Sequence, residues 1–252
     1  MANTLKIKYY NKKQFIPDIK KALPDKMHRG LPILDTEKCS QCGNCKTICP
    51  TAAIGQNPIS IDLGKCIFCG DCERICKTGA IIFSNFNKLS SASREGLVIT
   101  EKTTSEAFLP PAFKVRQEIK HIFKNSLKLR QVSAGGCNGC EFELNACSNA
   151  NFDMGRFGIE FVASPRHADG LVITGPITRN MAPALEDAYH STPNPKVVIL
   201  TGACAISGGL FKDSTAIDRS FLQKYKIDLY IPGCPIHPLT FINAILCFIG
   251  RY

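Results

Sequence analysis

The second half of the chain alternates short apolar runs with segments of helical length. The apolar runs are IEFVAS, GLVITG, KVVILTG and IDLYIPG, and helix-length stretches such as residues 178–191 separate them. Strands that alternate with helices indicate a mostly parallel sheet covered on both faces. We therefore expect residues 131–252 to form an α/β domain.

A different pattern fills residues 35–84, where one motif occurs twice. Each copy passes through four cysteines and a turn of small residues into an apolar strand, as KTICPTAAI in the first copy and ERICKTGAIIF in the second. Such self-similarity indicates an internal structural repeat. We expect a separate small domain here, built from short helices and strands.

The remaining residues connect or precede these two domains. Residues 1–34 form a basic arm with three prolines, which is predicted to hold no core of its own. Residues 85–130 are predicted to be a linker, which is rich in Ser and Thr up to Pro110 and Pro111. After these prolines, one helical face carries the apolar residues Ala112, Val115, Ile119, Ile122, Phe123 and Leu127. We expect this amphipathic helix to pack on a neighbouring domain.

The net charge of +10 comes from two segments of the chain. Residues 1–30 hold eight Lys or Arg against two Asp, and residues 112–130 hold six against one Glu. No interleaving of aromatic and basic residues accompanies them, so we expect no nucleic-acid partner. Each basic run is either a solvated face or a contact with anionic lipid or an acidic partner.

The apolar runs also bear on where the protein works. The longest, LTFINAILCFIG, is shorter than the ~18 apolar residues that a membrane helix needs, and the first residues lack the apolar stretch of a signal peptide. Disulfide bonds are the minor alternative for the 14 cysteines. We expect the reducing cytoplasm as the compartment.

Eight of the cysteines form the run C-x₂-C-x₂-C-x₃-C twice, which is the ligand pattern of bacterial ferredoxins with two [4Fe–4S] clusters. In this pattern three cysteines wrap one cluster and the fourth reaches the other cluster. Zinc is the less favoured metal, because structural zinc sites usually separate two C-x-x-C pairs by a longer loop. Lys77 stands where the pattern usually has proline, but it removes no ligand. The predicted ligand sets are Cys39, Cys42, Cys45 and Cys76 for one cluster, and Cys66, Cys69, Cys72 and Cys49 for the other.

A second constellation lies in the α/β half. Cys137 and Cys140 occur in GGCNGCEFE, Cys204 follows the KVVIL strand, and Cys234 follows the DLY strand. Open α/β sheets build their sites beyond the carboxyl ends of the strands, so these four thiols can converge on one metal centre. A C-x-x-C pair alone is weak evidence and also fits a redox dithiol.

Several residues outside the cysteine ligand sets are predicted to have structural or electrostatic roles. Cys147, Cys247, His167 and His237 lie outside these patterns and are expected to be structural. Glu143 either relays protons near the cluster or caps a helix start. Lys65, Arg74 and Lys77 either favour the reduced state of nearby clusters or are ordinary surface charges.

Four segments resemble the small-subunit family shared by group 4 membrane-associated [NiFe] hydrogenases and respiratory complex I, the NADH-quinone oxidoreductase. They are SLKLRQVSAGGCNGCEFE, RFGIEFVASPRHADGLVITGPITRN, GACAISGG and LYIPGCP. In complex I, this family member is the 20 kDa subunit. Residues 30–84, with RGLP and DLGKCIFCGDCERIC, resemble the ferredoxin-like subunit of formate hydrogenlyase-type complexes. The chain thus looks like a fusion of two neighbouring subunits. The implied fold is an α+β ferredoxin-like di-cluster domain followed by an α/β domain with a flavodoxin-like sheet.

This resemblance also implies a function. Cys137, Cys140, Cys204 and Cys234 would ligate a third [4Fe–4S] cluster, next to a nickel–iron site in a separate large subunit. Asn138 and Gly139 separate Cys137 from Cys140, as in hydrogenases, whereas complex I has adjacent cysteines there. The chain would carry electrons from a formate dehydrogenase module or a ferredoxin to that large subunit, which makes H₂. No residue of this chain is expected to be catalytic. Membrane-embedded subunits would hold the complex on the cytoplasmic face of the membrane.

Two alternatives remain open. One is a complex I-like carrier whose partner has lost nickel. The other is a free-standing ferredoxin-like carrier without a catalytic partner.

Overall fold

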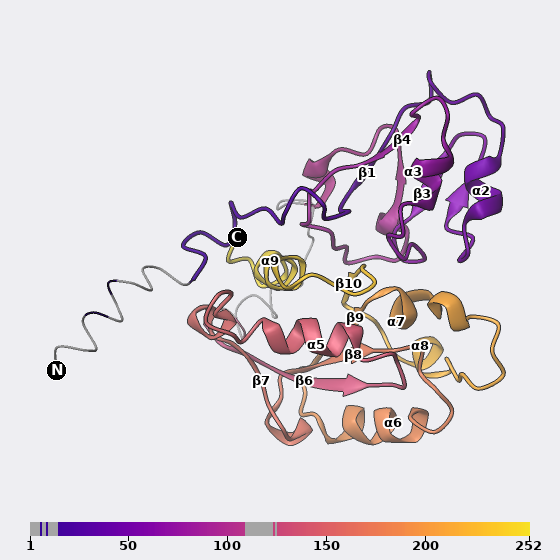
Figure 1. Cartoon of the computed structure of the whole chain (residues 1–252). Coiled ribbons are helices and arrows are strands. Elements are labelled where there is room, and N and C mark those ends of the chain that lie inside the picture. Colours follow the sequence, from indigo (N-terminus) through magenta and orange to yellow (C-terminus); the bar gives the residue numbers. More distant parts are fainter. Residues whose placement is uncertain (1–5, 7–8, 10–14, 109–122, 124) are drawn as a thin grey trace.

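The computed structural model describes the whole chain except residues 1–5, 7–8, 10–14, 109–122 and 124. Figure 1 shows a small module, coloured indigo to purple, above a larger α/β body in pink to yellow. Most of the amphipathic helix expected after Pro111 lies outside the described residues. For Leu127 that expectation is wrong, because Leu127 is the first residue of a strand of the central sheet.

The small module consists of two antiparallel sheets and two short helices. One sheet pairs β1 with β4, and the other has the order β2-β3-β5. Strand β5 lies within the segment expected to be a linker, but it pairs with β3 and so extends the module's sheet. The elements are β1 (Pro32–Leu34), α2 (Asn44–Ile48), β2 (Ile54–Gly55), β3 (Ser60–Asp62), α3 (Asp71–Ile75), β4 (Ile81–Phe83) and β5 (Val98–Thr100).

The sequence repeat is also a repeat of backbone conformation. Gln41 and Phe68 occupy matching motif positions, and both have positive φ, at 55° and 54°. Gly43 and Gly70, which precede the two helices, have φ of 77° and 79°. Glycine suits this left-handed backbone because it has no Cβ to clash. The two copies therefore turn around their cysteines in the same way.

Five parallel strands form the central sheet of the larger body, in the order β10-β9-β8-β6-β7. All residues of β8 and β9 are buried, as expected for strands covered on both faces. The strand order matches the flavodoxin-like order 2-1-3-4-5, which confirms the predicted fold class. The strands are β6 (Leu127–Ser133), β7 (Ile159–Phe161), β8 (Gly170–Thr174), β9 (Val197–Thr201) and β10 (Leu229–Ile231).

Helices cover both faces of this sheet (Figure 1). Leu171 and Ile173 of β8 belong to the same core as Leu185 of α6, whereas Val172 belongs to the core of α9. All eleven residues of α9 are buried, and this helix lies between the sheet and the small module. The helices are α5 (Gly139–Ala146), α6 (Ala182–Ser191), α7 (Ala203–Ser207), α8 (Phe221–Lys224) and α9 (Pro238–Phe248). Short 3-10 helices cover Glu95–Leu97, Ser105–Phe108, Met154–Phe157, Pro165–His167 and Gly209–Phe211.

The small module and the larger body share one hydrophobic core. Ile61 and Leu97 of the module belong to the same core cluster as Ile206 and Phe221 of the body. Ser91 and Tyr230 add an antiparallel bridge, with N–H···O distances of 3.0 and 2.8 Å. Because apolar side chains are continuous across this seam, the two halves are packed as one unit.

Residues 16–22 of the basic arm pack on the larger body, whereas Pro32–Leu34, which also lie in the segment expected to be an arm, form β1 of the small module. Ile19 is only 2% exposed, and its carbonyl accepts a hydrogen bond from Asn243 Nδ2 in α9 at 3.2 Å. Arg156 Nη2 donates to the carbonyl of Ile16 at 2.6 Å. Contacts with the α/β body therefore fix this part of the arm. Among the described residues, no helix combines the length and apolar character needed to cross a membrane.

Candidate iron–sulfur sites

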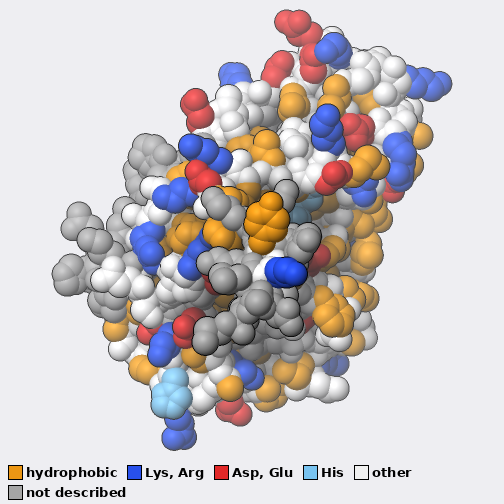
Figure 2. Space-filling view, turned by 60° about the vertical axis from the view of Figure 1, so that its left-hand side comes forward, with side chains coloured by type: hydrophobic (Ala, Val, Ile, Leu, Met, Phe, Trp, Pro, Cys, Tyr) orange, Lys and Arg blue, Asp and Glu red, His pale blue; other side chains and the backbone are white. Residues whose placement is uncertain are grey.

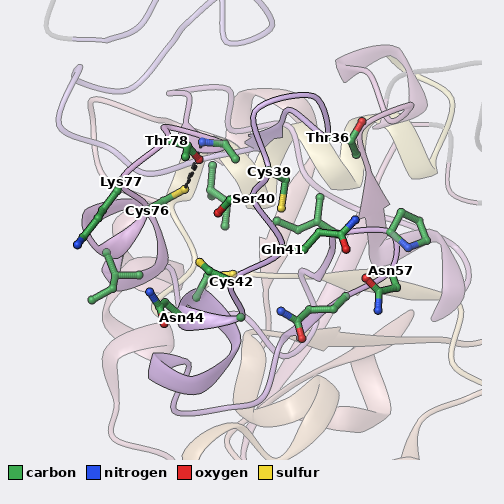
Figure 3. Close-up of a pocket in the computed structure, with 18 residues that line it drawn as sticks. Thr36, Cys39, Ser40, Gln41, Cys42, Asn44, Asn57, Cys76, Lys77 and Thr78 are labelled. Carbon is green, nitrogen blue, oxygen red and sulfur yellow. Dashed lines mark hydrogen bonds between the residues drawn. The ribbon is translucent and has the colours of Figure 1, made fainter.

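The first group of thiols surrounds a cavity of about 440 Å³ in the small module. Its cysteines are Cys39, Cys42 and Cys45 from the first motif and Cys76 from the second (Figure 3). These are the four residues of one predicted ligand set, and we call them the first site. The cavity is open at the surface, since Cys42 is exposed. Four thiols around this much space suit a cluster of several atoms better than one ion.

The second group, or second site, is more enclosed. Its cavity of about 20 Å³ is lined by Cys49 from the first motif and by Cys66, Cys69 and Cys72 from the second. Cys66 and Cys72 are 9% and 8% exposed, and burial raises the pKa of each thiol to about 12. The fourth cysteine of each motif thus lies with the first three of the other motif.

Backbone N–H groups point at the sulfur atoms in both sites. Ala53 N lies 3.3 Å from Cys49 Sγ, and Ala80 N lies 3.2 Å from Cys76 Sγ, which is the same contact in the two copies. Partial burial opposes ionisation of Cys76, but the Thr78 hydroxyl and the Ala80 amide overcome this and lower its pKa. Donors placed in this way stabilise negative charge on sulfur, as a ligating thiolate requires.

The third group, or third site, gathers Cys137, Cys140, Cys204 and Cys234 at one edge of the central sheet. The thiol of Cys204 lies within electrostatic range of those of Cys234 and Cys137, and the thiol of Cys140 lies within range of those of Cys234 and Cys204. Burial raises the pKa of Cys140 to about 12 and that of Cys204 to about 11. Within the described residues, no three His, Cys, Asp or Glu side chains converge closely enough to hold a single metal ion.

The third site lies beyond the carboxyl ends of the strands. Cys137 follows β6, and Cys204 and Cys234 follow β9 and β10. The sheet order changes direction between β6 and β8, and such a switch point opens a crevice at the carboxyl edge. Gly175, just after β8, borders this crevice: a Cβ there would lie 2.6 Å from Gly136 N. The loops can approach one another because these positions lack side chains.

Glycines also leave room at the sulfur atoms of the third site. A Cβ on Gly202 would lie 2.7 Å from Cys140 Sγ, and one on Gly209 would lie 3.0 Å from Cys204 Sγ. Real Cβ atoms essentially never show the first distance, and the second is tighter than nine in ten real Cβ contacts. The backbone therefore comes as close to these sulfurs as it can, which fits a loop folded tightly around a metal cluster.

Glu141 is a residue of the third site that the sequence patterns did not single out. Its Oε1 accepts hydrogen bonds from Ser133 Oγ at 2.7 Å and Thr174 Oγ1 at 2.6 Å. It thereby ties the start of α5, next to Cys140, to the ends of β6 and β8. Its position directly after a cysteine was the only available signal in the sequence.

Glu143, the carboxylate that the sequence did single out, lines a different cavity. This cavity has a volume of about 280 Å³ and also contains Cys234 and His237 in its lining. Burial raises the pKa of Glu143. His237 caps α9, because its Nδ1 accepts from Leu239 N at 3.1 Å, and its ring lies 5.1 Å from that of His28. Its structural role is as expected.

The basic residues near the first two sites have different surroundings. Lys65 lies 3.8 Å from Asp62, Arg74 pairs with Asp71, and Lys77 lines the first site. The remaining cysteines, Cys147 and Cys247, are buried in the core of α9, apart from the three sites. His167 ends the short helix Pro165–His167.

The second and third sites approach each other across the seam. Although Cys234 is an exposed residue, partial burial of its thiol raises the pKa of Cys234, and the thiols of Cys137 and Cys69 raise it further. Cys69 belongs to the second site and Cys234 to the third. One thiol of the small module therefore lies within electrostatic range of one thiol of the α/β body.

Comparison with known proteins matches the two halves separately. Residues 31–77 match the 4Fe-4S dicluster domain, and residues 137–248 match the family described as NADH ubiquinone oxidoreductase, 20 Kd subunit. An uncharacterized protein of Methanocaldococcus jannaschii, MJ0516, is 41% identical over 129 residues, which cover 51% of this chain and 86% of that protein. The chain belongs to the 20 kDa subunit family.

Other members of the 20 kDa subunit family are named subunits of larger complexes. The probable membrane-bound hydrogenase subunit mbhJ of Pyrococcus furiosus is 37% identical over 46% of this chain and 69% of its own length. Formate hydrogenlyase subunit 7 of Escherichia coli is 44% identical over 50% of this chain, which spans only half of that protein. Together with the dicluster domain, these relatives confirm the predicted fusion.

A solved structure also aligns with this member of the 20 kDa subunit family. It is that of the membrane-bound sulfane sulfur reductase, an archaeal respiratory membrane complex. The alignment covers 55% of this chain and 73% of the other, with 29% identity and a TM-score of 0.44. This score is too low to establish a shared fold.

Proposed function

We propose that this protein is an electron-transfer subunit of a membrane-associated oxidoreductase complex and that it holds three [4Fe–4S] clusters. The observation that carries the proposal is the arrangement of twelve cysteines in three groups of four, with Cys69 of the second group within electrostatic range of Cys234 of the third. Iron–sulfur clusters pass electrons one at a time, so a row of such sites can form a path through the protein.

The ligands follow from the three groups. The first site would use Cys39, Cys42, Cys45 and Cys76, the second Cys49, Cys66, Cys69 and Cys72, and the third Cys137, Cys140, Cys204 and Cys234. Bound there, a [4Fe–4S] cluster supplies reversible one-electron chemistry. The chain's own residues hold the sulfurs, donate N–H groups to them and exclude water from the second site.

The exposure of the sites indicates where partners would bind. Cys42 exposes the first site to an external donor, such as a ferredoxin or a formate dehydrogenase module. Cys137 and Cys234 are exposed at the third site, and Phe142 of α5, near Cys140 in sequence, is 71% exposed. We infer that a [NiFe] hydrogenase-like large subunit covers this end and reduces protons to H₂ there. Membrane-embedded subunits would attach the assembly to the cytoplasmic face.

The described residues on the face of the molecule in Figure 2 carry charges of both signs. Basic and acidic side chains are interspersed on it, with hydrophobic side chains between them. Interspersed charged and apolar side chains of this kind suit contacts with protein partners.

Chemical analysis of the anaerobically purified protein tests the proposal. We expect about twelve iron and twelve sulfide per chain, since each cubane contributes four of each. A value near eight would remove the third cluster. Cys204→Ala should abolish one EPR signal and spare the pair in the small module. Survival of all three signals would refute the ligand assignment.

A second function is favoured by a different set of relatives. A subunit of the NAD(P)H-quinone oxidoreductase of Picosynechococcus is 45% identical over 42% of this chain. A complex I-like partner without nickel would make this chain a carrier toward a quinone. Two measurements on the affinity-purified complex separate the functions: the hydrogenase proposal requires nickel and H₂ evolution, whereas the quinone alternative requires neither.

A further inference from the structure

Arg219 holds the helix that carries Cys204. Its guanidinium donates to four carbonyl oxygens: Nη1 to those of Pro176 and Cys204, both at 3.2 Å, and Nη2 to those of Ala205 and Ile206, at 2.8 and 3.0 Å. Helix α7 has only five residues, so its last carbonyls have few partners within the helix. The planar fork of an arginine can reach several acceptors at once. Arg219 thereby joins α7 to the loop that follows β8.

The charge of Arg219 has no carboxylate counter-ion in the described part of the chain. Burial lowers the pKa of Arg219, the Cys204 thiolate opposes this effect, and Arg94 adds to it. Arg94 is itself neutralised, because its two terminal nitrogens bind the carboxylate of Asp62 at 2.8 and 2.7 Å. A half-buried charge is costly unless something of opposite sign compensates it.

The anionic group that can compensate the charge of Arg219 is the third site itself. The groups that act on the Cys204 thiol are those of Cys234 and Cys137, the carboxylate of Glu141 and the guanidinium of Arg219. Arg219 is the one cation among them. Four thiolates around a [4Fe–4S] core carry net negative charge, and reduction adds one more negative charge. A fixed cation behind one ligand favours the more negative form.

We propose that Arg219 is a positioning residue and counter-charge for the third site: its fork fixes Cys204, and its charge raises the reduction potential of the cluster held there. This inference rests on the proposed function, which assigns Cys204 as a ligand. It adds a residue outside the cysteine motifs that sets how readily the last site of the chain accepts an electron.

The test is an EPR-monitored redox titration of the anaerobic full-length protein, with the third signal identified by its loss in Cys204→Ala. At the ambient potential that half-reduces this cluster in the unmodified protein, Arg219→Met should lower the ratio of reduced to oxidised cluster about tenfold, which corresponds to 59 mV for one electron. Arg219→Lys keeps the charge and should recover most of the shift. The two clusters of the small module should titrate unchanged.

Arg156→Met is the matched control. Arg156 also donates from Nη2 to a carbonyl, that of Ile16, but it lies just before β7, at the amino edge of the sheet. Its substitution should leave the third potential unchanged. An unshifted potential in Arg219→Met, or equal shifts in the Lys and Met variants, would overturn the counter-charge role.

Two outcomes keep this inference separate from the proposed function. If Arg219→Met loses the third cluster, the comparison moves to Arg219→Lys, which should retain the cluster and a near-normal potential but show faster hydrogen exchange at the amides of α7. Loss of the signal in that variant too, with the other two signals intact, would overturn the counter-charge role. Absence of a third cluster from the unmodified protein would instead overturn the proposed function.

Discussion

At the third site, glycines leave the space that the cysteine sulfur atoms occupy. Gly202 has a φ of +89°, and a Cβ there would lie 2.7 Å from Cys140 Sγ. Gly202→Ala should therefore displace Cys140 and lose the third cluster, while the pair in the small module stays. Gly155→Ala is the matched control, because a Cβ at Gly155 meets nothing within 4 Å. Iron analysis and EPR check both variants, and a full complement of clusters in Gly202→Ala would contradict the close approach.

The carboxylate of Glu141 offers a second test, in which the reduction potential of the third cluster should shift in the direction opposite to that in Arg219→Met. Glu141→Gln keeps an oxygen that can accept from Ser133 and Thr174, but it removes a negative charge beside Cys140. The reduction potential of the third cluster should rise in this variant, since negative charge near a cluster disfavours reduction. The same EPR titration measures it. Glu160→Gln, an exposed change on β7, should leave the potential unchanged.

Some residues of the sites could be predicted from the sequence and others could not. Cys204 and Cys234 were predictable because each follows an apolar strand, and parallel strands bring their carboxyl ends to one edge. Glu141 and Arg219 were not, because each has a partner distant in sequence: Glu141 and Thr174 are 33 positions apart, and Arg219 and Pro176 are 43. A contact of this kind leaves no local pattern. The ligand sets themselves remain a prediction.

At the scale of elements, the apolar runs predicted four of the five sheet strands and missed β6. Lys128, Arg130 and Gln131 interrupt the apolar residues of β6, and the helical pattern that precedes it continues through Leu127. Periodicity alone cannot place the boundary between two such patterns. Strand β5 was missed for a different reason, since its apolar run GLVIT stands alone in a segment that is otherwise rich in Ser and Thr.

Helix α9 packs against the central sheet and the basic arm, and one of its residues gives a stability test. Phe241 is fully buried and stacks on Phe161, with ring centroids 5.7 Å apart. Phe241→Ala should lower the free energy of unfolding by about 3–5 kcal/mol, because it leaves a cavity in the core. Phe142→Ala removes the same atoms from a side chain that is 71% exposed. It should change the free energy of unfolding by less than about 0.5 kcal/mol. Urea denaturation of the anaerobic protein compares them, and equal losses would contradict the burial of α9.

At the scale of the whole molecule, apolar contacts stabilise the seam, and the Arg94–Asp62 ion pair of the small module lies beside it. The Arg94–Asp62 pair is largely shielded, with side-chain exposures of 28% and 14%, and a Cβ on Gly64 beside it would meet both Arg94 and Ile206 of α7. Arg94→Met should reduce the free energy of unfolding by about 1–3 kcal/mol, because it removes two hydrogen bonds from the shielded carboxylate of Asp62 and leaves that carboxylate the Gly64 N–H and the more distant Lys65.

The exposed Arg74–Asp71 pair of the small module provides the comparison for this variant. Arg74→Met should cost less than about 1 kcal/mol, as exposed pairs do. Chemical denaturation should show a single transition for both variants, because the module and the α/β body share a core. Two separate transitions in the unmodified protein would contradict that shared core.

The shared core has a kinetic consequence. In a pathway built from separate carriers, each transfer waits for two proteins to collide in the right orientation, so its rate depends on how concentrated they are. Here Cys69 and Cys234 belong to one polypeptide whose halves share a core, and no encounter has to be repeated. Passage between those two sites should be first order, and diluting the protein should leave its rate constant unchanged.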